Sequence, residues 1–191
     1  MNKQIYEYHP IIGYRFIPNI QTRVQHESGG YLIKTNSLGF RSEFEFNPTK
    51  TENYKRILLF GDSYTAADGV SNKRRYSDAL MQMLPNTEIY NFGMPGTGTD
   101  QQYLIYKEYA KDIEHDLIMI VVLVENIRRV NAKYRVYLND RNERIVFQKP
   151  YFQLQDKTLI LKNIPVDPNH IKARDLQTSE KKKLMKEADS L

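Results

Sequence analysis

Three short apolar runs, each followed by glycine or a polar residue, alternate with two segments of helical spacing. The runs are residues 56–60, 88–92 and 117–124, and the helical segments are 74–84 and 99–111. Strand–helix–strand–helix–strand order with short connections predicts a parallel sheet with right-handed crossovers. The third run is continuous and rich in β-branched residues, so we expect a strand buried on both faces.

The chain on either side of this α/β region has a different character. Residues 1–50 carry scattered proline and glycine between short alternating stretches, which predicts an N-terminal arm of irregular or hairpin structure packed on the domain. The remaining residues, 51–191, form the predicted α/β domain. Within it, residues 134–166 have the pattern of two β-hairpins, an antiparallel insert. From residue 171 the chain becomes charged and ends in a lysine-rich tail.

Composition and charge exclude several classes of function. A chain of 191 residues with 40% hydrophobic and 27% charged residues is sufficient for one globular domain. The absence of cysteine excludes disulfides, thiolate metal sites and cysteine nucleophiles. The net charge of +5 is mild, and the fourteen tyrosines follow no basic stripe, so we expect no nucleic-acid partner.

Targeting signals and cofactor motifs are also missing from the sequence. The amino terminus lacks the apolar core of a secretory signal, and residues 117–124 are too few to cross a bilayer, so we expect a cytoplasmic protein without a membrane partner. The carboxylates Asp62, Asp68 and Asp100 fit no metal-ligand spacing. The glycine-rich segment 93–98 lacks the features of a P-loop. We therefore expect neither metal nor cofactor, and the sequence assigns no oligomeric state.

Polar groups follow each of the three predicted strands. Ser63 stands in a Gly-Asp-Ser turn after the first strand, Gly93 follows the second, and Asn126 follows the third. Acyl transfer needs a nucleophile, a base and donors aimed at the developing oxyanion. The Ser63 hydroxyl, the N–H groups of Ser63 and Gly93, and the Asn126 amide are candidates for the nucleophile and donors. Each residue also has a purely structural alternative: Ser63 in a plain strand-to-helix turn, Gly93 as a turn glycine, and Asn126 in a loop or as a helix cap.

Together these motifs resemble the SGNH/GDSL hydrolases, a family that includes bacterial serine esterases and acetylesterases. The resemblance implies a three-layer α/β/α sandwich of flavodoxin-like type with a parallel central sheet. It also implies Ser63 as nucleophile, an oxyanion hole of Ser63 N–H, Gly93 N–H and Asn126, and a small acyl ester or acetylated saccharide as substrate. The segments that carry the resemblance are residues 60–65, 91–101 and 125–126, with 13–19 and 35–41 in the arm.

The proton acceptor is the open question. The last motif of the family is Asp-x-x-His, and Asp167 and His170 have that spacing. Three alternatives remain: Asp167 and His170 form the working pair, the base lies beyond Leu191, or the protein does not catalyse. In the last case the chain is a binding module with the fold of the family. An acyltransferase would share the site and differ only in the acceptor.

Overall fold

The computed structural model describes residues 5–26, 29–138, 141, 143–169, 171–172, 178–179, 182 and 188–189. They belong to two compact units. The first, here called the sheet unit, is Phe16–Val124, and the second, the hairpin unit, combines Met1–Arg15 with Glu125–Leu191. Neither boundary falls at residue 50, where we expected the arm to end, because residues 16–50 belong to the same unit as the central strands.

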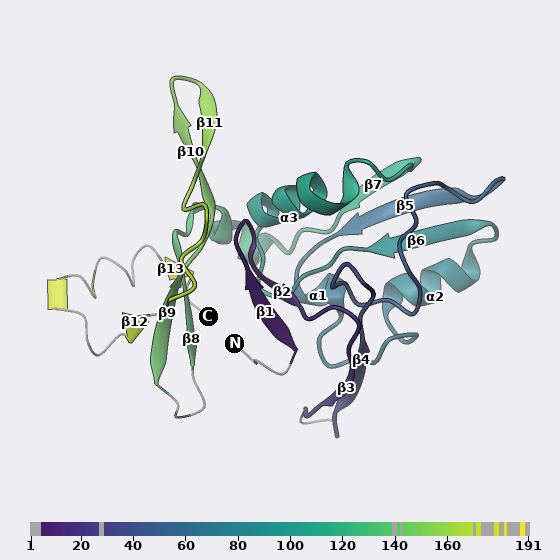
Figure 1. The fold of residues 1–191 in the computed structure, drawn as a ribbon, viewed down its shortest axis with the longest axis horizontal. Helices are drawn as coiled ribbons and strands as arrows, with labels where there is room; N and C mark the ends of the chain where they lie inside the picture. Colours follow the sequence, from purple (N-terminus) through teal and green to yellow (C-terminus); the bar gives the residue numbers. More distant parts are fainter. Residues whose placement is uncertain are drawn as a thin grey trace. The chain divides into compact units, whose positions relative to one another are not determined.

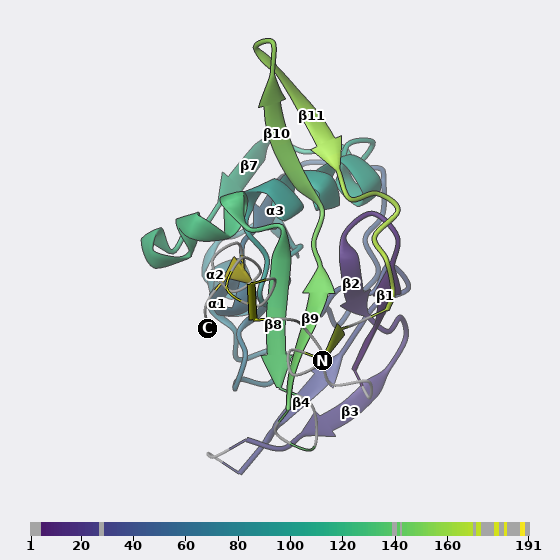
Figure 2. The same cartoon turned by 90° about the vertical axis from the view of Figure 1, so that its left-hand side faces the viewer.

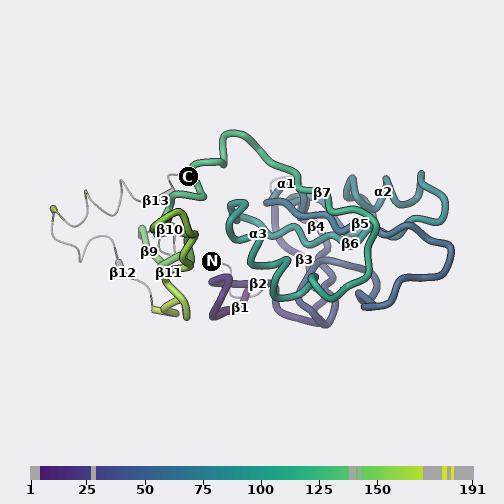
Figure 3. Tube along the Cα trace, turned by 90° about the horizontal axis from the view of Figure 1, so that it is seen from above, coloured from purple at the N-terminus to yellow at the C-terminus, as the bar shows by residue number. Residues whose placement is uncertain are grey.

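The sheet unit contains a parallel sheet of strand order β6-β5-β7 (Figures 1 and 3). The predicted alternation of strands and helices is confirmed here, since α2 separates β5 from β6 and α3 precedes β7. A π-helix, η1, continues α3 toward β7. The bounds are β5 Lys55–Phe60, α1 Ser63–Ala66, α2 Tyr76–Met83, β6 Thr87–Asn91, α3 Thr99–Ile105, η1 Tyr106–Ala110 and β7 Leu117–Ile120.

The expected three-layer α/β/α sandwich is wrong. The described residues form a mixed structure: one three-stranded parallel sheet, and small antiparallel sheets that are mostly hairpins. The physical reason lies at β7, where Leu117, Ile118 and Ile120 are exposed, so no helix layers enclose this strand. The prediction that residues 117–124 form a doubly buried strand is therefore also wrong. After β7 the described chain continues with a 3₁₀ helix and then two β-hairpins.

The hairpins predicted within residues 134–166 are confirmed (Figure 2). Asp156 and Lys157 form the tip of the second hairpin with φ of 47° and 64°, the left-handed values that a tight hairpin turn requires. In the first hairpin, Val136 and Val146 face each other and are buried. The strands of the hairpin unit are β1 Tyr6–His9, β2 Gly13–Phe16 (which ends inside the sheet unit), β8 Tyr134–Leu138, β9 Arg144–Gln148, β10 Tyr151–Gln155, β11 Thr158–Lys162, β12 Ile171–Lys172 and β13 Ala188–Asp189.

Residues 16–50 form an integral part of the sheet unit. Their strands β3 (Gln21–Val24) and β4 (Tyr31–Lys34) are antiparallel, and the chain then turns back so that Thr35 bridges Arg41, as the sequence predicted. Aromatic rings fix the segment that follows. Phe40 and Phe46 pack on β6 and the residue after it. The centroid distances are 4.4 Å for Phe46–Tyr90, 4.9 Å for Phe40–Phe92 and 5.0 Å for Phe46–Phe92.

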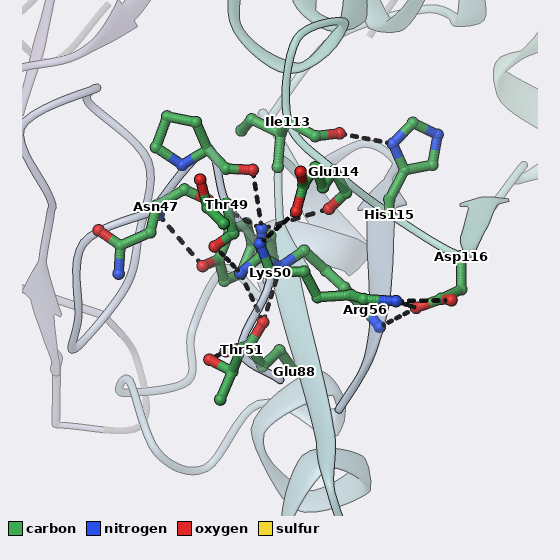
Figure 4. Close-up of polar contacts among 12 residues, drawn as sticks. Asn47, Thr49, Lys50, Thr51, Arg56, Glu88, Ile113, Glu114, His115 and Asp116 are labelled. Atoms are coloured by element: carbon green, nitrogen blue, oxygen red, sulfur yellow. Dashed lines mark hydrogen bonds and ion pairs between the residues drawn. The ribbon is translucent and has the colours of Figure 1, made fainter. Parts of the chain in front are cut away.

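A buried arginine joins this segment to the amino-terminal end of β5 (Figure 4). The Arg56 side chain is fully buried, and its Nε donates to Glu88 Oε2 at 2.7 Å. Its terminal nitrogens donate to the carbonyl oxygens of Asn47 at 2.8 Å and Thr49 at 2.9 Å. The guanidinium also lies 4.4 Å from the ring centroid of Tyr90. A buried cation is tolerated here because its donors have acceptors.

A second ion pair lies at the same end of the sheet (Figure 4). Lys50 Nζ donates to both carboxylate oxygens of Asp116, at 2.8 and 2.9 Å, and the Arg56 backbone N–H donates to Oδ2 at 2.8 Å. The hydrogen bond from Lys50, followed by that from the Arg56 backbone, lowers the pKa of Asp116 to about 2. Residues 47–50 are thus bound to the starts of both β5 and β7.

The Arg56→Met variant tests whether this arginine holds the segment. Loss of the guanidinium removes the ion-pair partner of Glu88 and the hydrogen-bond donors to the carbonyl oxygens of Asn47 and Thr49, so we expect the free energy of unfolding to fall by about 3 kcal/mol. Urea unfolding followed by circular dichroism measures the loss. The control is Lys55→Met, which removes a neighbouring cation whose side chain is 77% exposed; we expect a change within about 0.5 kcal/mol. Equal losses in both variants would contradict the interpretation.

Candidate active site

The Gly-Asp-Ser turn follows β5 directly. A Cβ on Gly61 would lie 2.0 Å from Thr65 Oγ1, so glycine is required at this position. The Asp62 side chain caps the next element: its Oδ1 accepts from the Tyr64 N–H at 3.0 Å. Ser63 is consequently the first residue of α1, at the carboxyl end of β5. This is the edge at which parallel sheets place their ligands.

The loop after β6 packs against α1. A Cβ on Gly93 would lie 2.5 Å from the Ala66 nitrogen and 2.7 Å from the Thr65 carbonyl carbon. The Met94 N–H donates to the Gly61 carbonyl at 3.0 Å. The structure therefore brings the turn that carries Ser63 into contact with the loop that carries Gly93.

Asn91 is the centre of the polar contacts beneath this turn. The residue is 3% exposed, and its Nδ2 donates to the Thr65 carbonyl and to Ser77 Oγ, both at 2.8 Å. Its Oδ1 accepts from the Gly93 N–H at 2.8 Å. The Gly93 N–H, expected as an oxyanion donor, is thus already hydrogen-bonded. Sequence reasoning gave Asn91 no role of its own, although an asparagine two residues before a loop glycine is a signal for such a turn.

Ser63 itself is partly exposed. Within the part of the chain that the structure describes, its hydroxyl forms no hydrogen bond. Its N–H is one of the first in α1, and these groups have no acceptor inside the helix. An oxyanion next to Ser63 could therefore use this N–H without displacing an intrahelical bond.

Arg41 holds the carboxyl-terminal side of α1. Its side chain is buried, and it donates to the carbonyl oxygens of Ala66 at 2.7 Å, Ala67 at 2.8 Å and Val70. Its Nε donates to Asn72 Oδ1 at 3.1 Å. The sequence indicated Arg41 only as part of the segment that resembles the family. No local pattern predicts that a distant guanidinium binds these carbonyls.

Asp68, which follows α1, has an unusually weakly acidic carboxyl group, that is, a raised pKa. Partial burial raises the pKa of Asp68 to about 6, against the opposing effect of the Arg41 guanidinium. The neighbouring charge of Asp62 also raises this pKa, whereas His26 lowers it. The His26 ring lies next to Gly69, where a Cβ would be 3.3 Å from two ring atoms.

The three remaining predicted site residues lie outside the sheet unit, which carries Ser63 and Gly93. Asn126 lies in the 3₁₀ helix η2 (Val124–Asn131) and belongs to the hairpin unit. Asp167, also in the hairpin unit, is exposed and accepts from the backbone and side chain of Asn169, at 2.9 and 2.8 Å. His170 lies outside the described residues. The structure therefore assembles two of the five predicted residues, and the roles of all five stay predictions.

Comparisons with known proteins do not identify the chain. No protein-family model matches it, and no curated protein matches it. The resemblance to SGNH/GDSL hydrolases consequently depends on the sequence motifs alone. In the described part of the chain, no three histidine or carboxylate side chains gather in a way that could hold a metal ion. The described helices include none with the length and apolar composition needed to span a bilayer.

The Gly93→Ala variant tests the close packing of the two loops. The added methyl meets backbone atoms of Thr65 and Ala66 that no rotamer change can move, so we expect the free energy of unfolding to fall by about 3 kcal/mol. Gly29→Ala serves as the control, because Gly29 has a φ of +93° with nothing within 4 Å. Its left-handed backbone alone should cost about 1–2 kcal/mol. A smaller loss for Gly93→Ala than for Gly29→Ala would refute close packing as the cause.

The raised pKa of Asp68 predicts a pH dependence of stability. The folded state binds this proton more tightly than the unfolded chain, so the free energy of unfolding should fall as the pH rises from about 4 to about 6. Asp68→Asn should lose this slope and be more stable than wild type at pH 7. Thermal unfolding across this pH range measures both effects. Asp112→Asn, at an 87% exposed side chain, should keep the wild-type slope.

Proposed function

We propose that the protein is a serine esterase of the SGNH/GDSL type that hydrolyses small acyl esters, such as acetyl groups on carbohydrate. The observation that carries the proposal is the state of Ser63. It stands at the carboxyl end of a parallel strand, is partly exposed, and its hydroxyl is not engaged by any described residue. A serine in a purely structural turn would more commonly use its hydroxyl to satisfy a nearby backbone group.

In the proposed reaction, Ser63 Oγ attacks the ester carbonyl and its proton passes to a histidine, for which His170 is the candidate. The carbonyl oxygen becomes an oxyanion that accepts from Ser63 N–H, Gly93 N–H and the Asn126 amide. Each such donor typically contributes about 3 kcal/mol to transition-state stabilisation. The alcohol leaves with the proton, and water then attacks the acyl-enzyme to release the acid.

In this proposal the Gly93 N–H has two possible acceptors, Asn91 Oδ1 and the oxyanion. In the structure it donates to Asn91 Oδ1 at 2.8 Å. A backbone N–H can be shared between two acceptors, and an oxyanion is a stronger acceptor than a neutral amide oxygen. The proposal therefore requires that Gly93 shares its N–H, or turns away from Asn91, when the oxyanion forms.

A second candidate function is a non-catalytic binding module with the same turn. Two observations favour it: the Gly93 N–H is already engaged, and no described residue accepts a proton from Ser63. Serine without a base is a weak nucleophile at neutral pH. Such a module would bind an acyl-saccharide saturably without turning it over. An acyltransferase would pass the acyl group from Ser63 to an acceptor other than water.

The Ser63→Ala variant separates these functions. If Ser63 is the nucleophile, we expect p-nitrophenyl acetate hydrolysis to fall by at least about 10³-fold, and a fluorophosphonate to label only the wild type, at Ser63. Ser37→Ala is the matched control, because the Ser37 hydroxyl already donates a hydrogen bond to Glu45 Oε2. Equal rates for wild type and Ser63→Ala would reject the nucleophile. Absence of turnover and labelling, with saturable binding of an acetylated saccharide, would favour the binding module.

A further inference from the structure

A histidine side chain closes the turn between β1 and β2. His9, the last residue of β1, is 8% exposed, and its Nδ1 accepts the backbone N–H groups of Ile11 and Ile12, both at 3.2 Å. Because both partners are donors, Nδ1 is the unprotonated nitrogen, and the neutral ring carries its proton on Nε2. The closed turn thus depends on an uncharged imidazole.

The same turn binds a distant segment of the hairpin unit (Figure 2). The Val166 N–H donates to the Pro10 carbonyl oxygen at 2.7 Å, and the Tyr8 hydroxyl donates to the Val166 carbonyl oxygen. The Pro10 carbonyl and the Ile11 N–H belong to one peptide group, which is planar and rigid. The His9 ring, by accepting this N–H, therefore orients the peptide group to which Val166 is bound.

Protonation of His9 would remove the acceptor that closes the turn. An imidazolium carries a proton on both nitrogens, so no rotation of the ring restores an acceptor. The new Nδ1–H would instead face two N–H donors, one of them on Ile12, which is fully buried. A buried donor that loses its acceptor destabilises the closed turn.

The other titratable or charged side chains on the segments around this turn are not imidazoles. The carboxylates are Glu7 and Asp167, the phenols are Tyr6, Tyr8, Tyr14 and Tyr137, and the cations are Arg15, Arg135 and Lys149. Carboxyl groups and phenols ordinarily titrate near pH 4 and pH 10, roughly, whereas imidazole titrates at about pH 6.5. In the described part of the hairpin unit, His9 is the one imidazole.

We propose that His9 is a pH-sensitive switch in the amino-terminal hairpin. The neutral ring keeps the β1–β2 turn closed on Val166, and protonation between about pH 7 and about pH 5 opens the turn. Opening releases the hydrogen bonds of the Ile11, Ile12 and Val166 N–H groups together. Asp167 follows Val166 directly, so acid also frees the start of the segment that Asp167 begins. The switch belongs to the hairpin unit and does not require the proposed esterase reaction.

Hydrogen exchange of the full chain, followed by NMR at single amides, measures this opening. We expect the protection factors of the Ile11, Ile12 and Val166 amides to fall by about 30-fold from pH 7.5 to pH 5, because protonation of a free imidazole stabilises the open turn by that factor over this range. A local readout is needed, since Asp68 in the sheet unit titrates at about pH 6. Protection that stays constant, after correction for intrinsic exchange, would overturn the proposal.

Variants of His9 separate the acceptor from the proton. In His9→Asn, Oδ1 takes the place of Nδ1 on Cγ but cannot be protonated, so wild-type protection at pH 7.5 should remain and its pH dependence should vanish. His9→Ala should lose protection of these amides at both pH values. His26→Asn removes an exposed imidazole from the sheet unit and, as the matched control, should keep the wild-type profile. Wild-type pH dependence in His9→Asn would refute the switch.

The tautomer of His9 provides a test on the unmodified chain. Long-range ¹H–¹⁵N correlations of the wild type at pH 7.5 should show the ring proton on Nε2, because Nδ1 accepts the two backbone N–H groups. A proton on Nδ1 at this pH would be incompatible with the closed turn and would reject the proposal even if no variant of His9 folds.

Discussion

The position of the candidate nucleophile depends on the buried guanidinium of Arg41. A helix of four residues such as α1 cannot persist by itself, and the carbonyls at its end lack partners within the helix. Arg41 supplies charge-assisted hydrogen bonds to the carbonyls of Ala66, Ala67 and Val70. The turn that carries Ser63 is therefore fixed from its far side by a residue of the preceding segment, whereas Asp62 fixes it only locally.

A second guanidinium, that of Arg56, has the same function at the opposite end of β5. It binds the carbonyls of Asn47 and Thr49, while aromatic packing of Phe46 on Tyr90 fixes the chain between the two arginines. Residues 35–50 are thus attached near both ends of the central strand. This explains why they belong to the same compact unit as the central strands.

The contact between the Ser63 turn and the Gly93 loop is compatible with either acyl transfer or binding without turnover. Asn91 orders the loop by accepting the Gly93 N–H, and this same N–H is the one that an oxyanion would need. Loop rigidity and oxyanion binding therefore compete for one donor. If the loop can release the Gly93 N–H from Asn91, the site has two backbone donors beside a hydroxyl, which suits acyl transfer. If it does not, Ser63 N–H is the one backbone donor of the proposed pair left to a ligand, which suits binding without turnover.

The sequence alone determined the elements whose causes are local. The apolar runs at β5 and β6, the glycine at 61 and the turn at residues 156–157 follow from side-chain periodicity and turn chemistry, which neighbouring residues fix. The tertiary structure decided the rest. The apolar sequence of residues 117–124 does not show whether helices or water cover the strand, because burial depends on segments distant in the chain. The partners of Arg41 and Arg56 could not be predicted from the sequence either. Most of them are backbone carbonyls, which every residue carries and no sequence pattern marks.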